Sequence, residues 1–246
     1  MNKNLLKIGI SIFAIILGLL LLSRPVNNFI DPVRKLQSML GFNNKFFQKL
    51  LSGLSNGVEE KDPQLTAEER LIVENRLQEA QKKLTEATTN EEKFSAWMQI
   101  GFGQYGLGKY KEAKESFLKA AVLEPDNYVV YVALYQVELD MKDNQSARKS
   151  IKKAISLKEQ NPDLWRKYIL LETERFSASP EKLKDLYQEA LTKTNSHFDI
   201  ETLYAQFLEK SGDLKSALDT WKKIAEQMPD PLYQEEIKRI EDLLKL

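Results

Sequence analysis

The pattern of hydrophobic and polar positions divides the chain into three parts. Residues 8–23 are apolar and uncharged on every side, and residues 31–51 place apolar residues three and four positions apart between basic ones. From residue 65 onward, apolar positions recur with the same helical period, and no convincing run alternates in the way of a half-buried strand. The pattern therefore predicts an all-α chain with parts at residues 1–24, 25–64 and 65–246.

The apolar run predicts an N-terminal transmembrane helix over residues 5–23. A bilayer core of roughly 30 Å needs about 20 apolar residues, and this run reaches the lower limit because Lys7 can extend its ammonium group to the headgroups. A cleaved signal peptide is the alternative, but residues 21–25 lack the pair of small residues that a cleavage site needs. The short basic N-terminus favours the cytoplasm, so we expect a single-pass membrane protein whose large domain lies on the extracytoplasmic side.

Residues 31–51 predict a basic amphipathic segment that breaks near Gly41. Its basic residues are opposed only by Asp31, and such a stretch beside a membrane span suits the lipid interface. An ordinary helix packed on the main domain or on a partner explains the pattern equally. Residues 52–64 hold two glycines and a proline, which is typical of a flexible linker.

The strongest pattern is an internal repeat. Residues 94–127 hold two helical segments, a glycine-rich turn at residues 106–108 and a closing proline, with small residues where the two helices would cross. They resemble the tetratricopeptide repeat, a helix–turn–helix unit of about 34 residues, and Gln104 replaces its usual tyrosine. The matching residues are Trp97, Ile100, Gly101, Ala113, Phe117, Ala120 and Pro125.

Further units follow from about residues 128, 164 and 198. A helix at residues 67–88 and a final helix at residues 231–246 are expected to cap the two ends, the latter with Ile237, Ile240 and Leu244 on one face and a polar outer side. The resemblance implies an α-α superhelix, a right-handed solenoid of helix–turn–helix repeats. The later units keep the repeat signature at Ala147, Ala154, Ala190, Gly212, Ala217, Trp221 and Pro229.

The resemblance also implies a concave groove, lined by the first helix of each unit, that binds a protein or peptide. Aromatic and methionine side chains of the kind that binding surfaces use fall at the expected groove positions. Self-occlusion is the alternative, because the helix at residues 67–88 or the segment at residues 31–51 could cover the same positions. The expected groove residues are Met98, Phe102, Tyr105, Val129, Val132, Gln136, Trp165 and Tyr168.

Composition excludes several classes of function. Lys and Arg number 36 and so do Asp and Glu, so the basic excess that typically accompanies nucleic-acid binding is missing. There is no cysteine for a disulfide or thiolate site, and the single histidine, His197, cannot form a two-histidine metal site. The glycines at residues 101–106 lie in a helical hairpin without a preceding strand, unlike a dinucleotide fingerprint. We expect no enzyme activity, cofactor, metal, nucleic acid or small-molecule substrate.

The functional prediction is a membrane-anchored adaptor or scaffold that mediates protein–protein interaction through its groove. One alternative is a structural subunit, assembled permanently into a membrane complex through its outer face and caps. Another is a chaperone-like holdase that binds unfolded clients.

Overall fold

The computed structural model describes residues 65–245, all of which belong to one compact unit. The predicted transmembrane helix at residues 5–23 and the amphipathic segment at residues 31–51 lie outside the described residues. Among the helices that the structure does describe, none is both long and apolar enough to cross a membrane.

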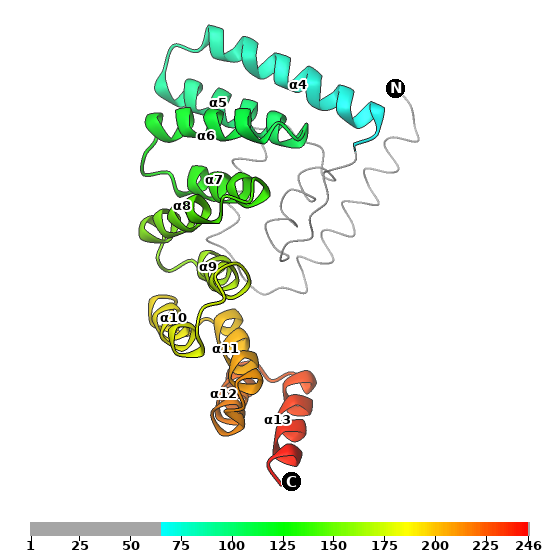
Figure 1. The fold of residues 1–246 in the computed structure, drawn as a ribbon, viewed down its shortest axis with the longest axis vertical. Coiled ribbons are helices and arrows are strands. Elements are labelled where there is room, and N and C mark those ends of the chain that lie inside the picture. Colours follow the sequence, from blue (N-terminus) through cyan, green and yellow to red (C-terminus); the bar gives the residue numbers. More distant parts are fainter. Residues whose placement is uncertain (1–64, 246) are drawn as a thin grey trace. The chain divides into compact units, whose positions relative to one another are not determined.

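The described chain is all-α, as predicted, and Figure 1 shows its helices following one another as hairpins. Successive hairpins pair α5 with α6, α7 with α8, α9 with α10, and α11 with α12, while α4 packs on α5 and α13 on α12. The helices are α4 (Ala67–Glu86), α5 (Asn90–Gly106), α6 (Tyr110–Leu123), α7 (Tyr128–Asp140), α8 (Asn144–Leu157), α9 (Pro162–Glu174), α10 (Pro180–Lys193), α11 (Phe198–Lys210), α12 (Leu214–Gln227) and α13 (Pro231–Leu243).

Short polar side chains set where these helices begin. Thr66 and Thr89 each form a capping box, with Glu69 and Glu92 three residues later, so two otherwise unpaired N–H groups are satisfied at each start. Ser179 caps α10 and Pro180 fills its first turn, where a missing N–H costs nothing. Ser179 and Pro180 therefore mark the start of this helix.

Small residues let the two helices of a unit approach closely. A Cβ atom built on Gly101 would lie 2.5 Å from the Phe117 ring, so only glycine fits between α5 and α6. The signature alanines, Phe117 and Trp221 are buried, as expected from the repeat pattern. Trp97 departs from this pattern because it is only half-buried, with the Lys119 ammonium 4.2 Å above its ring.

The third unit begins at Pro162, two residues before the predicted start at Leu164. Trp165 Nε1 donates to the carbonyl of Glu159, and one repeat earlier the Tyr131 hydroxyl donates to the carbonyl of Pro125. Trp165 is thus the counterpart of Tyr131. The two extra residues of this unit lie between its helices: residues 175–179 connect α9 to α10, whereas residues 141–143 suffice between α7 and α8.

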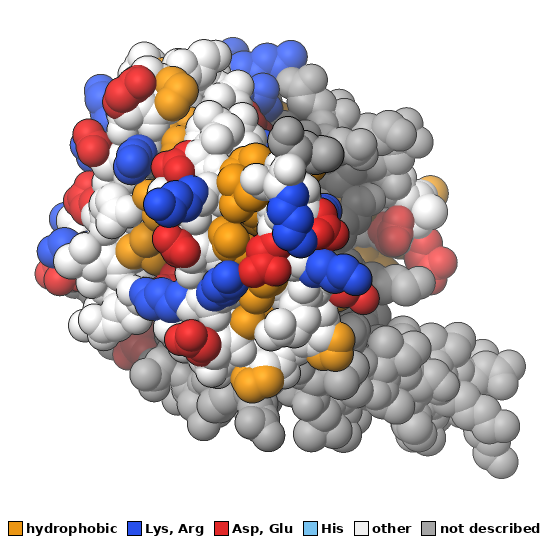
Figure 2. All heavy atoms as spheres, turned by 90° about the horizontal axis from the view of Figure 1, so that it is seen from below, with side chains coloured by type: hydrophobic (Ala, Val, Ile, Leu, Met, Phe, Trp, Pro, Cys, Tyr) orange, Lys and Arg blue, Asp and Glu red, His pale blue; other side chains and the backbone are white. Residues whose placement is uncertain are grey.

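The C-terminal helix buries Ile237 and Ile240, as predicted for a cap, but Leu244 lies beyond the helix and is exposed. The outer side of this end is not purely polar. Figure 2 shows this face with hydrophobic side chains among charged ones, and the exposed apolar residues of the last helices are Phe198, Met228, Leu232, Leu243 and Leu244.

Candidate functional site

The candidate site is the surface of the first helices of the units, α5, α7, α9, α11 and α13, here called the A-helix face. The structure separates the predicted groove residues into two groups. Met98, Phe102 and Trp165 are buried, with exposed fractions of 1%, 7% and 3%. The half-buried residues, which remain within reach of a partner, are Tyr105, Val129, Val132, Gln136 and Tyr168.

Two of the predicted residues join α5 to α7. The Tyr105 hydroxyl donates to the carboxylate of Asp140, and the Gln136 amide lies 3.5 Å from the same carboxylate oxygen. Burial raises the pKa of Tyr105, and the negative charge of Asp140 raises it further, so the phenol stays protonated at neutral pH. Tyr105 is therefore held in one orientation at the edge of the A-helix face.

A row of equivalent residues runs across the A-helix face. Each row residue lies two positions after a helix cap, and its backbone N–H donates to the side chain of that cap. The caps are Asn127, Asn161, His197 and Asp230. Residues at equivalent places on successive helices present their side chains in the same way. This A-helix row, apolar at both ends and acidic in the middle, consists of Val129, Asp163, Asp199 and Leu232.

The acidic members of the row lie in different surroundings. Asp163 has Arg166 as its ionic partner, 3.4 Å away. Asp199 lies 3.5 Å from Nδ1 of His197, and its backbone N–H donates to the same nitrogen. Burial raises the pKa of Asp199, the nearby carboxylate of Asp163 raises it further, and His197 and Arg166 lower it.

Sequence reasoning missed Asp163 and Leu232 as members of this row. The start of the third unit was placed two residues late, which put Trp165 and Tyr168 on the groove and left Asp163 off it. The signal that identifies the true register is local: Asn127 and Asn161, both helix caps, lie one repeat length apart.

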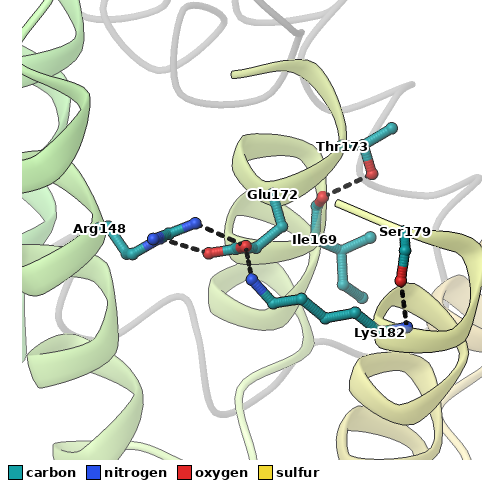
Figure 3. Close-up of polar contacts among 6 residues, drawn as sticks. All are labelled: Arg148, Ile169, Glu172, Thr173, Ser179 and Lys182. Atoms are coloured by element: carbon teal, nitrogen blue, oxygen red, sulfur yellow. Dashed lines mark hydrogen bonds and ion pairs between the residues drawn. The ribbon is translucent and has the colours of Figure 1, made fainter. Parts of the chain in front are cut away.

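Buried ion pairs fix the stacking of the units beneath this face. Lys114 of α6 lies 3.0 Å from Glu138 of α7, and one repeat further on Arg148 of α8 lies 2.6 Å from Glu172 of α9. Figure 3 shows the Glu172 carboxylate between Arg148 and Lys182, which donates to it from α10 at 2.6 Å. One carboxylate therefore joins three helices from two units.

Glu172 is fully buried, so these bonds are needed to hold it in its charged form. Burial by itself would raise the pKa of Glu172, but the hydrogen bonds from Lys182 and Arg148 outweigh burial and hold the pKa below its usual range. The site is a rigid support for a binding surface. Across residues 65–245, no cluster of acidic or histidine side chains is arranged to hold a metal ion.

The comparisons with known proteins agree with this architecture. The tetratricopeptide repeat family matches residues 94–127. No curated protein matches the chain.

Three solved structures illustrate the similarity. The crystal structure of MamA aligns with a TM-score of 0.50 at 16% identity, over 80% of this chain and 99% of its own. MamA from residue 41 to its end, from Desulfovibrio magneticus RS-1, aligns with a TM-score of 0.46 at 18% identity, over 63% of this chain and 84% of its own. YrrB, a tetratricopeptide protein with an unusual peptide-binding site, aligns with a TM-score of 0.44 at 15% identity, over 80% of this chain and 98% of its own.

At 16% identity, the match to MamA shows a common fold and nothing more. Residues 94–127 therefore match the tetratricopeptide repeat family, and the described part of the chain shares the fold of MamA.

Proposed function

We propose that this protein is a scaffold that binds a segment of another protein along its A-helix face, tethered to a membrane by residues 5–23. The observation that carries the binding proposal is the A-helix row. The helices α7, α9, α11 and α13 present Val129, Asp163, Asp199 and Leu232 at equivalent places, and a hydrogen-bonded cap fixes the backbone of each. A row of fixed side chains that differ in polarity and charge is suited to binding a polypeptide segment of complementary sequence.

The burial of the predicted groove residues decides which variants can test this proposal. Met98 and Phe102 are buried, so a glutamate at either place would put an unpaired charge in the core and unfold the unit. Val129 is half-buried and Leu232 is 63% exposed, so both tolerate a charge better. The test compares Val129→Glu and Leu232→Glu with Gln188→Glu, an exposed position on α10.

The experiment is a crosslinking pull-down with the full-length chain from its native membranes. We expect a specific protein to be captured by the wild type and by Gln188→Glu, and to be lost from Val129→Glu and Leu232→Glu. Thermal unfolding of each variant shows that the loss is not caused by unfolding. Undiminished capture by both row variants would contradict the proposal.

The membrane tether rests on the sequence, since residues 5–23 lie outside the described part. Residues 8–23 are uncharged, and with Leu5 and Leu6 the apolar stretch reaches the length that partitions into a bilayer. We expect the full chain to stay in the pellet after alkaline carbonate extraction, and a chain with Ile15→Arg and Leu19→Arg to be released. Protease protection of residues 65–246 in intact cells or vesicles then tests the extracytoplasmic orientation.

A structural assembly subunit is a second candidate, favoured by the apolar C-terminal end. Leu243 and Leu244 are exposed there, although terminal repeats of a solenoid usually turn a polar side outward. A permanent interface at this end predicts that Leu243→Glu breaks a complex that survives Val129→Glu, which gel filtration of detergent extracts would show.

A further inference from the structure

The second helices of the units, α6, α8 and α10, carry a surface that the proposed binding face does not use. On α6, Val122 is 81% exposed and Leu118 is 47% exposed, one helical turn apart on the same side. Apolar residues this exposed are not part of the core, and together they form a small apolar patch on this side of the helix.

The next second helix, α8, is the most basic of the described helices. It carries four basic residues and no acidic residue between Asn144 and Leu157. Arg148 is bound to Glu172, but the remaining three, Lys149, Lys152 and Lys153, are exposed. Among the ion pairs between described residues, none includes these three lysines.

Two of the three lysines lie near aromatic rings. The Lys153 ammonium lies 5.7 Å from the centre of the Tyr131 ring, and the Lys152 ammonium lies 6.0 Å from that of Tyr168. Contacts of this kind attract a cation without neutralising it. The positive charge of α8 is therefore still available to an anion.

The apolar and basic residues occupy equivalent places on neighbouring units. Lys152 follows Leu118 by one repeat length, the same separation that relates the ion pair Lys114–Glu138 to the ion pair Arg148–Glu172. These residues therefore lie on the second helices of neighbouring units and are together called the lysine–valine surface. It consists of Leu118, Val122, Lys149, Lys152 and Lys153. The exposed acidic residue closest to it along α6 is Glu115.

We propose that the lysine–valine surface docks on an anionic lipid bilayer, with Val122 and Leu118 entering the headgroup region and the lysines binding lipid phosphates. Protruding aliphatic side chains beside lysines are the composition of a membrane-interface surface. Each lysine near an anionic leaflet contributes attraction, and a tethered domain meets that leaflet at high effective concentration. The inference draws on the proposed tether for that concentration, and it would hold the A-helix face at a fixed orientation to the bilayer.

A nucleic acid fits the surface less well, because it offers nothing to Val122 and Leu118. A protein partner would need a cavity for a side chain that protrudes as far as Val122. Both remain outcomes of the experiment below.

The test uses the absence of cysteine from the chain, since one introduced cysteine can carry a unique probe. Full-length Val122→Cys is labelled with an environment-sensitive nitrobenzoxadiazole fluorophore and reconstituted into bilayers of phosphatidylcholine, with or without about one-third phosphatidylserine. Thr192→Cys is the matched control, since it is exposed on α10 at the corresponding turn of the helix. Quenching by lipids that carry a spin label near the headgroup reports docking.

We expect quenching at position 122 in anionic bilayers only, and none at position 192. Adding Lys149→Gln, Lys152→Gln and Lys153→Gln should lower the quenched fraction about tenfold, whereas Lys111→Gln, Lys184→Gln and Lys215→Gln, which change net charge equally on other helices, should not. Equal quenching at both positions, no quenching in anionic bilayers, or a probe response only to added protein or to DNA would overturn the proposal.

Failure of the tether is detected by a separate measurement. If the chain does not incorporate, carbonate extraction shows it, and the labelled protein is then added to preformed anionic vesicles. Lysine-dependent quenching there upholds the docking surface without the tether, and its absence there overturns the docking surface as well.

Discussion

Arg148 of α8 and Glu172 of α9 form an ion pair, with Nε 2.6 Å from Oε1, across the boundary between the second and third units. Lys114 and Glu138 form the same link one unit earlier. In addition, Ser150 donates to Glu138 at 2.6 Å just as Ser116 donates to Gln104 at 2.7 Å. The units are thus joined by a polar pattern that repeats with the fold, and that fixes the angle at which one hairpin stacks on the next.

Glu172→Gln should destabilise the protein by about 1–3 kcal/mol at pH 7, because the buried side chain loses its charge-assisted hydrogen bonds from Arg148 and Lys182. The pKa of Glu172 is lowered in the folded state, so its contribution is present above the unfolded value of about 4.5 and is lost as pH falls through the folded value. The difference between wild type and variant in urea unfolding should therefore be constant from pH 7 to about pH 5 and shrink below that. Glu159→Gln, which removes the exposed partner of Lys193, serves as control and should change little.

Gly101→Ala should destabilise the protein by about 1–3 kcal/mol, because the new Cβ atom meets the buried Phe117 ring at 2.5 Å and one of the two helices must shift. Gly103→Ala is the matched control on the same helix, where the Cβ atom would lie 3.4 Å from that of Leu77. Because alanine favours helix more than glycine does, we expect no loss there and a gain of up to about 1 kcal/mol. Urea unfolding followed by circular dichroism measures both, and equal losses in the two variants would show that α5 and α6 do not meet at Gly101.

Lys142→Gly should stabilise the protein. Lys142 has φ of 60° in the turn between α7 and α8, where the first and fourth units place Gly108 and Gly212 at φ of 73° and 83°. The relief of backbone strain exceeds the added freedom of glycine in the unfolded chain, so we expect a gain of about 0.5–1 kcal/mol. Lys149→Gly, in the middle of α8, should instead lose about 1 kcal/mol. A melting temperature that falls for Lys142→Gly would refute the strain at this turn.

Asp199→Asn should stabilise the protein slightly at pH 7, by less than about 1 kcal/mol because the carboxylate is partly exposed. The folded-state pKa of Asp199 is raised above its ordinary value of 3.8, so the native state favours its protonated form. The stabilisation of the native state by protonated Asp199 is complete below pH 3.8 and is lost as the pH rises through the folded-state pKa. Asp199→Asn should therefore be more stable than the wild type only above that pKa. Thermal unfolding at pH 3 and pH 7 tests this, with Asp185→Asn, at an exposed position on α10, as the matched substitution.

The sequence alone determined the class of fold and most helix boundaries. Helix starts depend on local chemistry, and Thr66, Ser179 and Pro180 mark them directly. The close crossing of α5 and α6 was also predictable, because a glycine and an alanine at the spacing of Gly101 and Ala113 leave room for nothing larger than the opposing ring. These features involve residues near one another along the chain, so periodicity reveals them.

Only the tertiary structure decided the surroundings of the predicted groove. The register of the third unit is intermediate: an insertion can be placed at several points without disturbing the apolar period, but the spacing of the caps Asn127 and Asn161 and the contact of Trp165 with Glu159 place it between α9 and α10. Met98 looks like a groove residue from its position in the repeat, yet it is buried. Burial depends on which distant parts of the chain pack nearby, and the energy of that packing is not contained in the local pattern of hydrophobic and polar residues.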